Sequence, residues 1–135
     1  MGITGAKGIL INSEKKFLLH LRDDKPTIPF PNYWSLLGGG VEKGETVIEA
    51  FRREIKEEID YDLNSPIIPL GRFESSLGGM VYVYKSKIEK KLGELTLYEG
   101  QELGFFTFEE AIELKIPLVL KEFLIKNQDK ILSEF

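Results

Sequence analysis

The sequence predicts an α/β (α+β) fold, in which helices pack on a mixed β-sheet, formed by a single domain over residues 1–135. Three observations favour this fold. The length of 135 residues suits one domain. Short apolar runs bounded by turn residues alternate with amphipathic helical patterns. The composition, 42% hydrophobic and 30% charged, is ordinary for a globular protein with a packed core.

The first forty residues predict strands joined by turns. Residues 6–12 are mostly apolar and predict a buried strand, and residues 16–22 predict the second strand of a hairpin. Residues 23–33 contain three prolines, so this segment is neither a helix nor a central strand. A short strand at 34–37 then runs into a stretch of three glycines.

Helical patterns appear in the middle of the chain and near its end. Residues 45–59 repeat apolar side chains at helical spacing, and 60–65 break the pattern. Thr107, with Glu110 three residues later, forms a capping-box pattern that starts a further helix. The other elements are strands at 66–75, 79–86 and 103–107, a polar loop at 87–101, a helix at 108–114, and a terminal helix from Pro117 to about Leu132.

The composition excludes several classes of function. The chain has no cysteine, so it forms no disulfide, thiolate zinc site or cysteine nucleophile, and one histidine, His20, cannot build a multi-histidine metal site. A net charge of −4 does not favour general binding to nucleic acids. No apolar run approaches the roughly 18 residues of a membrane span, and no secretion signal opens the chain. We therefore expect a cytoplasmic monomer or homodimer without a membrane or a stable nucleic-acid partner.

Three glutamates of the central helix form an acidic face. Glu54, Glu57 and Glu58 stand at i, i+3 and i+4, which places their carboxylates on one side of the helix. Like charges so close repel one another, and a hard divalent cation such as Mg²⁺, Mn²⁺ or Ca²⁺ removes that cost. The alternative is a solvated charged face, helped by Lys56 and Arg53.

The glycines before this helix make a cation site more specific. A glycine loop after a strand lets the backbone approach a phosphate or expose a carbonyl to a metal. Gly39 is followed by Glu45 after five residues, then by Arg53-Glu54-Ile55 after seven more, Glu57-Glu58 after one, and Tyr61 after two. This string resembles the Nudix box, Gly-x5-Glu-x7-Arg-Glu-U-x-Glu-Glu-x-Gly-U, where U is bulky and aliphatic. The chain departs from it at Asp60, in place of glycine, and at Tyr61, in place of an aliphatic residue.

The resemblance to the Nudix hydrolase family implies an α/β/α sandwich with a mixed sheet and a catalytic loop-helix. It also implies hydrolysis of a nucleoside diphosphate linked to another group, with Mg²⁺ or Mn²⁺ as cofactor. By position, Glu54, Glu57 and Glu58 become metal ligands, with the Gly38 carbonyl as a further one. Glu45 and Arg53 become an ion pair that fixes the loop on the helix, so Arg53 joins the catalytic set; the alternative is an ordinary surface pair.

Further candidates lie outside the box. Glu99-Gly100-Gln101 resembles a Glu-Gly-Gln segment of MutT-type pyrophosphohydrolases, in which the glutamate faces the metal site as a ligand or base. Glu102 is the neighbouring rival, and either acid can instead be solvated.

The substrate side is predicted from residues around the glycine loop. Gly39 and Gly40 are candidates to contact phosphate through their backbone. Arg22 ends the second strand, where the family often presents a cation to phosphate or base; the alternative is a surface pair with Asp23 or Asp24. Phe30 or Tyr33 can stack on a nucleobase, whereas Trp34 and His20 are expected to be structural.

Three functions remain open. The first is conversion of a nucleoside triphosphate, including an oxidised one, into a monophosphate and pyrophosphate. The second is hydrolysis of a nucleotide sugar, ADP-ribose or a diadenosine polyphosphate. The third is a non-catalytic nucleotide-binding sensor built on the same fold, against which the complete set of three glutamates speaks.

Overall fold

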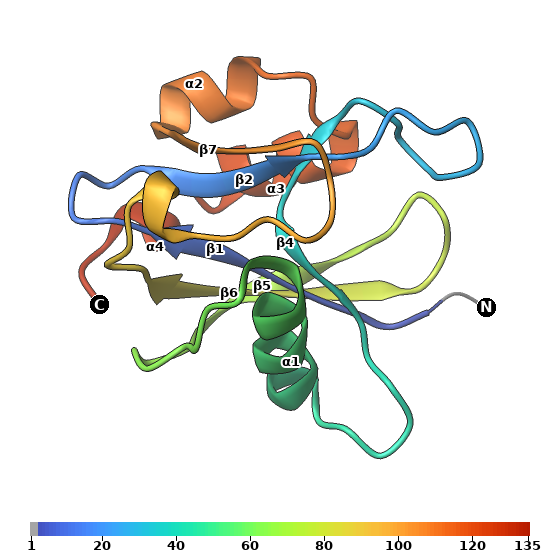
Figure 1. The fold of residues 1–135 in the computed structure, drawn as a ribbon, viewed down its shortest axis with the longest axis horizontal. Helices are drawn as coiled ribbons and strands as arrows, with labels where there is room; N and C mark the ends of the chain where they lie inside the picture. Colours follow the sequence, from blue (N-terminus) through green and yellow to red (C-terminus); the bar gives the residue numbers. More distant parts are fainter. Residues whose placement is uncertain (1–2) are drawn as a thin grey trace.

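The protein is a three-layer α/β/α sandwich, described by a computed structural model over residues 3–135 (Figure 1). Helix α1 (Val47–Ile59) covers one face of a seven-stranded mixed sheet, and three helices cover the other. This arrangement confirms the predicted fold class. The other elements are β1 (Gly5–Ile11), β2 (Phe17–Leu21), β3 (Trp34–Ser35), β4 (Leu37–Gly40), β5 (Ile68–Glu74), β6 (Met80–Lys87), the 3₁₀ turn η1 (Leu92–Glu94), β7 (Glu102–Phe106), α2 (Phe108–Glu113), α3 (Leu118–Lys126) and α4 (Gln128–Leu132).

Strand β1 is the centre of the sheet and has different neighbours along its length. On one side it runs parallel to β6 over its whole length. On the other side its first half pairs antiparallel with β4, and its last residues pair antiparallel with β2. Strand β2 also pairs with β3 and β7. The glycines of β4 therefore lie directly beside the first half of β1, which does not pair with β2.

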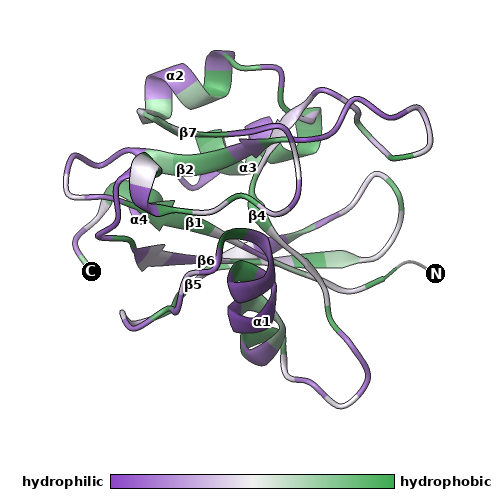
Figure 2. Ribbon diagram, viewed as in Figure 1, coloured by the Kyte–Doolittle hydropathy of each residue, from purple (hydrophilic) through white to green (hydrophobic). Residues whose placement is uncertain are grey.

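The side chains of β1 alternate between two cores. Ile9 and Ile11 lie in the core under α2, α3 and α4, whereas Ala6 and Leu10 lie in the core under α1. Phe51 of α1 is fully buried in the second core. Figure 2 shows hydrophilic residues on the outer side of α1. Because helices cover both faces of the sheet, β1 is an almost continuous apolar run.

Most predicted elements occur with small shifts in their bounds, but the strand predicted at 34–37 is two short strands, β3 and β4, and the three glycines belong to β4 rather than to a loop. Helix α1 begins later than predicted because Thr46 caps it: the Thr46 hydroxyl accepts a hydrogen bond from the Glu49 amide (3.1 Å). The Glu49 carboxylate accepts one from the Thr46 amide in return (2.8 Å). The single terminal helix predicted is instead two helices, because α3 ends at Lys126 and is followed by Asn127, whose side-chain amide donates to the Phe123 carbonyl (2.9 Å).

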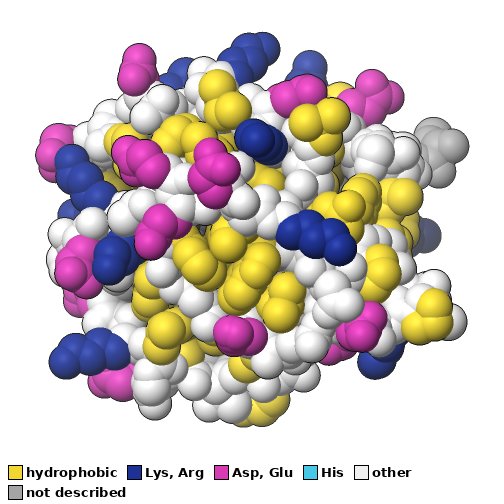
Figure 3. Space-filling model, turned by 90° about the horizontal axis from the view of Figure 1, so that it is seen from above, with side chains coloured by type: hydrophobic (Ala, Val, Ile, Leu, Met, Phe, Trp, Pro, Cys, Tyr) yellow, Lys and Arg dark blue, Asp and Glu magenta, His cyan; other side chains and the backbone are white. Residues whose placement is uncertain are grey.

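The surface carries charges of both signs. On the face shown in Figure 3, acidic and basic side chains are interspersed around a central group of hydrophobic side chains. Within residues 3–135, no helix is both long enough and apolar enough to cross a membrane.

Candidate active site

Two glycines of β4 form the floor of the candidate site. Gly38 has a φ of +130°, and a Cβ there would lie 2.1 Å from the Ala6 carbonyl oxygen, so only glycine fits between β4 and β1. At Gly39 a Cβ would lie 2.5 Å from the carboxyl carbon of Glu54. The two glycines therefore let β4 close onto β1 and let a carboxylate of α1 rest directly against the backbone.

Glu58 is the most buried of the three helix glutamates. Only 3% of the residue is exposed, and its Oε1 accepts a hydrogen bond of 2.7 Å from the Gly38 amide. Burial raises the pKa of Glu58 to about 8, although that hydrogen bond acts in the opposite direction. The structure therefore brings Gly38 and Glu58 together through the Gly38 amide.

Glu54 and Glu57 lie on the same side of α1 and share one cation. Arg53 Nη1 lies 3.1 Å from Glu54 Oε1 and 3.2 Å from Glu57 Oε1. The Glu54 side chain is 18% exposed, and burial is the main cause that raises its pKa, whereas the Glu57 side chain is 56% exposed. All three predicted carboxylates therefore face one region, and they differ in how much water reaches them.

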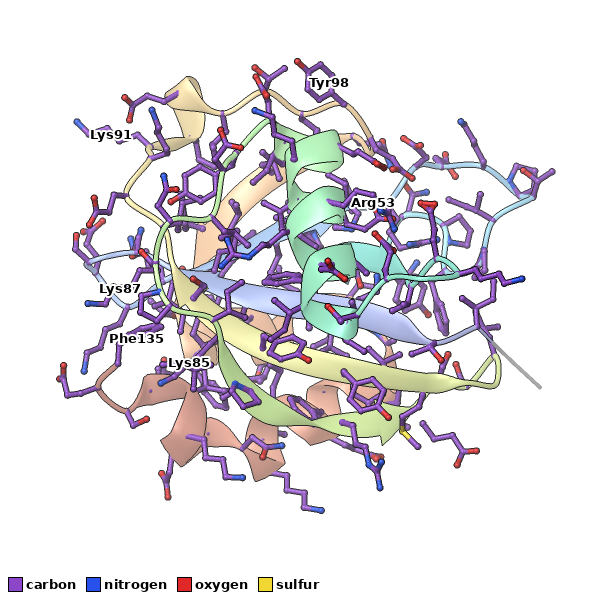
Figure 4. All side chains as sticks on the ribbon, turned by 90° about the horizontal axis from the view of Figure 1, so that it is seen from below. Arg53, Lys85, Lys87, Lys91, Tyr98 and Phe135 are labelled. Atoms are coloured by element: carbon purple, nitrogen blue, oxygen red, sulfur yellow. The ribbon has the colours of Figure 1, made fainter. Side chains whose placement is uncertain are left out.

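Arg53 ties the loop after β4 to α1, as the ion-pair interpretation expects. Its Nε and Nη2 donate to the two carboxylate oxygens of Glu45 (2.8 and 3.0 Å), and Nη2 also donates to the Gly40 carbonyl (3.0 Å). Glu45 in turn accepts from the Glu42 amide (2.8 Å). These hydrogen bonds raise the pKa of Arg53 and lower the pKa of Glu45. Figure 4 shows Arg53 extending from α1 towards this loop.

Asp60 occupies the position where the Nudix box has glycine, and it adopts the left-handed conformation expected there. Its φ and ψ are 53° and 43°, and its amide donates to the Lys56 carbonyl. Asp is among the few residues that tolerate this conformation. Lys56 also lies 2.9 Å from the Asp60 carboxylate. The substitution therefore leaves the end of α1 formed.

Glu99 lies near the helix glutamates, and Glu102 does not share its position. The charge of Glu99 contributes to the raised pKa of both Glu54 and Glu58. Glu102 is instead the first residue of β7, exposed and paired with Leu21 of β2. Of the two rival acids, Glu99 is the one next to the end of α1, because it follows Tyr98, whose amide donates to the Glu58 carbonyl.

The loop that carries Glu99 is fixed at both ends, by Tyr98, which the sequence did not single out, and by Gln101, for which the sequence indicated no role of its own. The Tyr98 amide donates to the Glu58 carbonyl (2.8 Å), and Tyr98 lies beyond the end of α1 in Figure 4. The Gln101 amide donates to the Leu21 carbonyl (2.8 Å). The Gln101 side chain donates to the Arg22 carbonyl and to Asn32 Oδ1, both at 2.7 Å. Gln101 is therefore a positioning residue that joins this loop to β2 and to the proline-rich loop.

Arg22 lines a pocket next to the acidic face rather than pairing with an aspartate. Its Nε donates to the Pro29 carbonyl (2.9 Å). We call the cavity the Lys7 pocket; it measures about 140 Å³ and is lined by Lys7, Arg22, Phe30, Phe73 and Leu120, among others. Lys7 is the second residue missed from the sequence. Its only signal was a charge inside an otherwise apolar strand.

The residues expected to be structural lie in the interior. Trp34 packs edge-on against Phe106, with ring centroids 4.9 Å apart, at the border of one core. His20 is 4% exposed, and neither of its ring nitrogens has a hydrogen-bond partner within the described chain. Burial lowers the pKa of His20 to about 4, helped by the charges of Lys7 and Arg22. His20 is therefore neutral near pH 7.

The donor set suits a hard divalent cation. Glu54, Glu57 and Glu58 offer carboxylate oxygens alone, the ligand type of Mg²⁺ and Mn²⁺. Two of the three have a raised pKa, so a bound cation would relieve the cost of their charges. Within residues 3–135, no three acidic or histidine side chains lie close enough together, in their present orientations, to bind one metal ion. Glu54 and Glu57 instead contact Arg53.

Comparison with known proteins agrees with this geometry. The nucleoside triphosphatase NudI of Escherichia coli is 47% identical over 55 residues, which make up 40% of this chain and 38% of NudI. The match therefore spans less than half the length of that relative. The crystal structure of a MutT protein from Methanosarcina mazei has a TM-score of 0.78 at 21% identity, and covers 97% of this chain and 96% of its own.

A second solved structure shares the fold. The C. elegans Ap4A hydrolase has a TM-score of 0.77 at 21% identity, with 94% of this chain and 97% of its own covered. A family model described as NUDIX domain matches residues 3–126, which include every site residue described above. The chain therefore belongs to the NUDIX family of hydrolases, which act on phosphorus-containing anhydrides and generally require divalent metal ions.

Proposed function

We propose that this protein is a Mg²⁺- or Mn²⁺-dependent pyrophosphohydrolase that converts a nucleoside triphosphate into a nucleoside monophosphate and pyrophosphate. The observation that carries the proposal is the acidic face of α1, held against the glycines of β4 and joined by Glu99. The identity to the Escherichia coli nucleoside triphosphatase NudI over 55 residues supports the triphosphate as substrate.

Glu54, Glu57 and Glu58 would hold the metal ions. A bound divalent cation supplies charge neutralisation for the diphosphate and activation of the attacking water. Glu58 is held in place by the Gly38 amide, so its orientation is set before the substrate binds. Glu57 is the most exposed of the three and meets the solvent side of the site.

The remaining residues position the substrate and move a proton. Glu99, on the loop joined to the end of α1 through Tyr98, would accept the proton of the attacking water or add a further ligand. Arg53 and Glu45 hold the loop that brings Gly39 and Gly40 to the phosphates. Arg22 offers a cation to the substrate at the other side of the acidic face. The reaction needs no covalent enzyme intermediate, which suits a chain without cysteine.

The test is a substrate panel with each product identified. The purified protein is incubated with Mg²⁺ and the eight common nucleoside and deoxynucleoside triphosphates, an oxidised triphosphate, ADP-ribose, a nucleotide sugar and a diadenosine polyphosphate. We expect the triphosphates to give the highest kcat/KM and to release pyrophosphate. Preference for another diphosphate would replace the triphosphate assignment, and binding without turnover in either metal would identify a sensor.

A further inference from the structure

Lys7 occupies a position in β1 where an apolar side chain is expected. It lies in the middle of β1, paired with Gly38 of β4 and with Val83 of β6. The alternation of β1 places it on the same face as Ile9 and Ile11, which are buried under α2, α3 and α4. The Lys7 side chain is half-buried, so its charge is partly removed from water, which is costly without a compensating partner.

Lys7 is half-buried, and its ammonium has no protein partner within the described chain. It makes none of the side-chain hydrogen bonds or ion pairs found within residues 3–135. The other lysine in the sheet interior shows what a structural lysine does here. Lys85 donates to the carbonyls of Lys130 (2.8 Å) and Ser133 (2.9 Å) and lies 4.5 Å from the ring centroid of Phe135. Figure 4 shows Lys85 and Phe135 at the same corner of the molecule.

Lys7 lines the Lys7 pocket together with Arg22. Lys7 pairs with Gly38, whose amide donates to Glu58, so it lies beside the acidic face of α1 as well as in the wall of the pocket. Beyond the two cations, the walls are apolar side chains such as Phe30 with a few serine hydroxyls. No carboxylate or carboxamide side chain lines the pocket to read the edge of a base.

We propose that Lys7, together with Arg22, binds the phosphate that joins the organic group of the substrate to the rest of the diphosphate, while the apolar walls receive that organic group. The proposal rests on the proposed function and deepens it. Because the affinity comes from the phosphate and from apolar contact, the pocket favours phosphorylated ligands and discriminates little between bases.

The test measures binding without metal or turnover. Isothermal titration in EDTA at about 0.15 M salt gives the Kd of dAMP, dCMP, dGMP and TMP for wild type and for Lys7→Met, which keeps the side-chain length and removes the charge. A hydrogen bond to a charged group contributes about 1.5–3 kcal/mol, so we expect Lys7→Met to weaken all four by a similar factor of roughly 10- to 100-fold. The control is Lys126→Met, the same charge change at the exposed last residue of α3, which should leave each Kd unchanged.

A stability measurement separates this role from a structural one. If Lys7 serves the ligand, Lys7→Met removes an unpartnered ammonium and raises the Tm of the free protein while weakening nucleotide binding. A lower Tm with unchanged Kd values would make Lys7 a structural counter-ion of Glu58 and overturn the proposal.

Other results also decide. If Lys7→Met weakens the binding of only one or two of the four nucleotides, Lys7 recognises the base, which contradicts the proposal. If wild type shows no saturable binding of any of the four, the pocket does not bind nucleotides, which also contradicts it. Failure of the proposed function looks different. It would appear as no triphosphate turnover by a wild type that still binds the monophosphates through Lys7.

Discussion

Replacing Gly39 with alanine tests whether the position of Glu54 matters for catalysis. The added methyl group would lie 2.5 Å from the Glu54 carboxyl carbon and 2.6 and 2.7 Å from its two oxygens. Ordinary contact begins near 3.4 Å. The obstacle is the far end of a flexible side chain, and Gly39 has no left-handed φ, so the backbone can stay in place while the carboxylate moves.

The size of this movement sets the expected effect. Restoring ordinary contact pushes the carboxylate away by roughly 1 Å, and a misplacement of that size near the reacting atoms costs about 10²-fold in rate. Because the strain is relieved by one side chain, the free energy of unfolding should change by less than about 1 kcal/mol. Gly39→Ala should therefore lower kcat about 10²-fold in a protein that is still folded.

The assay combines steady-state kinetics with urea unfolding of the same preparations. Gly93→Ala is the matched control, because nothing lies within 4 Å of a Cβ at Gly93, which stands in the 3₁₀ turn η1 and has no assigned role in the site. It should behave as wild type in both measurements. A kcat of Gly39→Ala within twofold of wild type would refute the reasoning, and so would an equal loss of kcat and stability.

Four further predictions follow from the site. Glu57→Gln should lower kcat by roughly 10²-fold or more at saturating Mg²⁺ with little loss of Tm, and near-normal kcat would remove Glu57 from the ligand set. EDTA should abolish turnover, and Mg²⁺ or Mn²⁺ should restore it; full activity in EDTA would exclude the mechanism. Glu99→Gln should reduce kcat about 10²- to 10⁴-fold if Glu99 is the base, and less if it is a peripheral ligand, while Glu102→Gln should cost little; the reverse order would contradict the placement of the loop. Below pH 6.5 His20 takes up a proton in the unfolded chain, whereas in the folded chain its pKa is lowered to about 4. Between pH 7 and pH 4, the free energy of unfolding of wild type, measured with urea, should therefore fall by about 3 kcal/mol more than that of His20→Leu. Parallel curves of stability against pH would show instead that His20 gains a proton while folded.

The sequence predicted the elements whose signal is local. The helix of the acidic face appeared from its apolar spacing, and the capping box of Thr107 and Glu110 is formed, with the hydroxyl accepting the Glu110 amide at 3.1 Å. What it could not predict is how β1 divides its pairing between β4 and β2. That arrangement depends on strands distant in sequence. It decides which residues lie beside the glycines.

The site was predictable where spacing along one helix carried the information. Glu54, Glu57 and Glu58 needed only helical periodicity, and Arg53 needed only its distance from Glu45. The position of Lys7 beside the pocket depends on how β1, β4, β6 and α3 come together. No spacing in the sequence predicts that arrangement. Gln101 matched a motif, but its bonds to Arg22 and Asn32 join segments far apart in the chain.

Polar groups with few or no hydrogen-bond partners lie near β4, on β1, β2 and α1. Glu58 is a buried carboxylate whose one hydrogen bond comes from the Gly38 amide and whose pKa is raised to about 8. Half-buried Lys7 has no protein partner within the described chain, and neither nitrogen of His20 is bonded. Elsewhere buried polar groups are satisfied: Ser86 donates to the Pro66 carbonyl at 2.9 Å. Since folding alone favours satisfied polar groups, such a concentration indicates a place where stability is given up for ligand binding. Each of the three is affected by the charge of another group in the cluster, Lys7 by Glu58 and His20 by Lys7. This proximity is what the two proposals share: the acidic face of α1 would bind the metal ions and phosphates of a substrate whose apolar ring would occupy the Lys7 pocket.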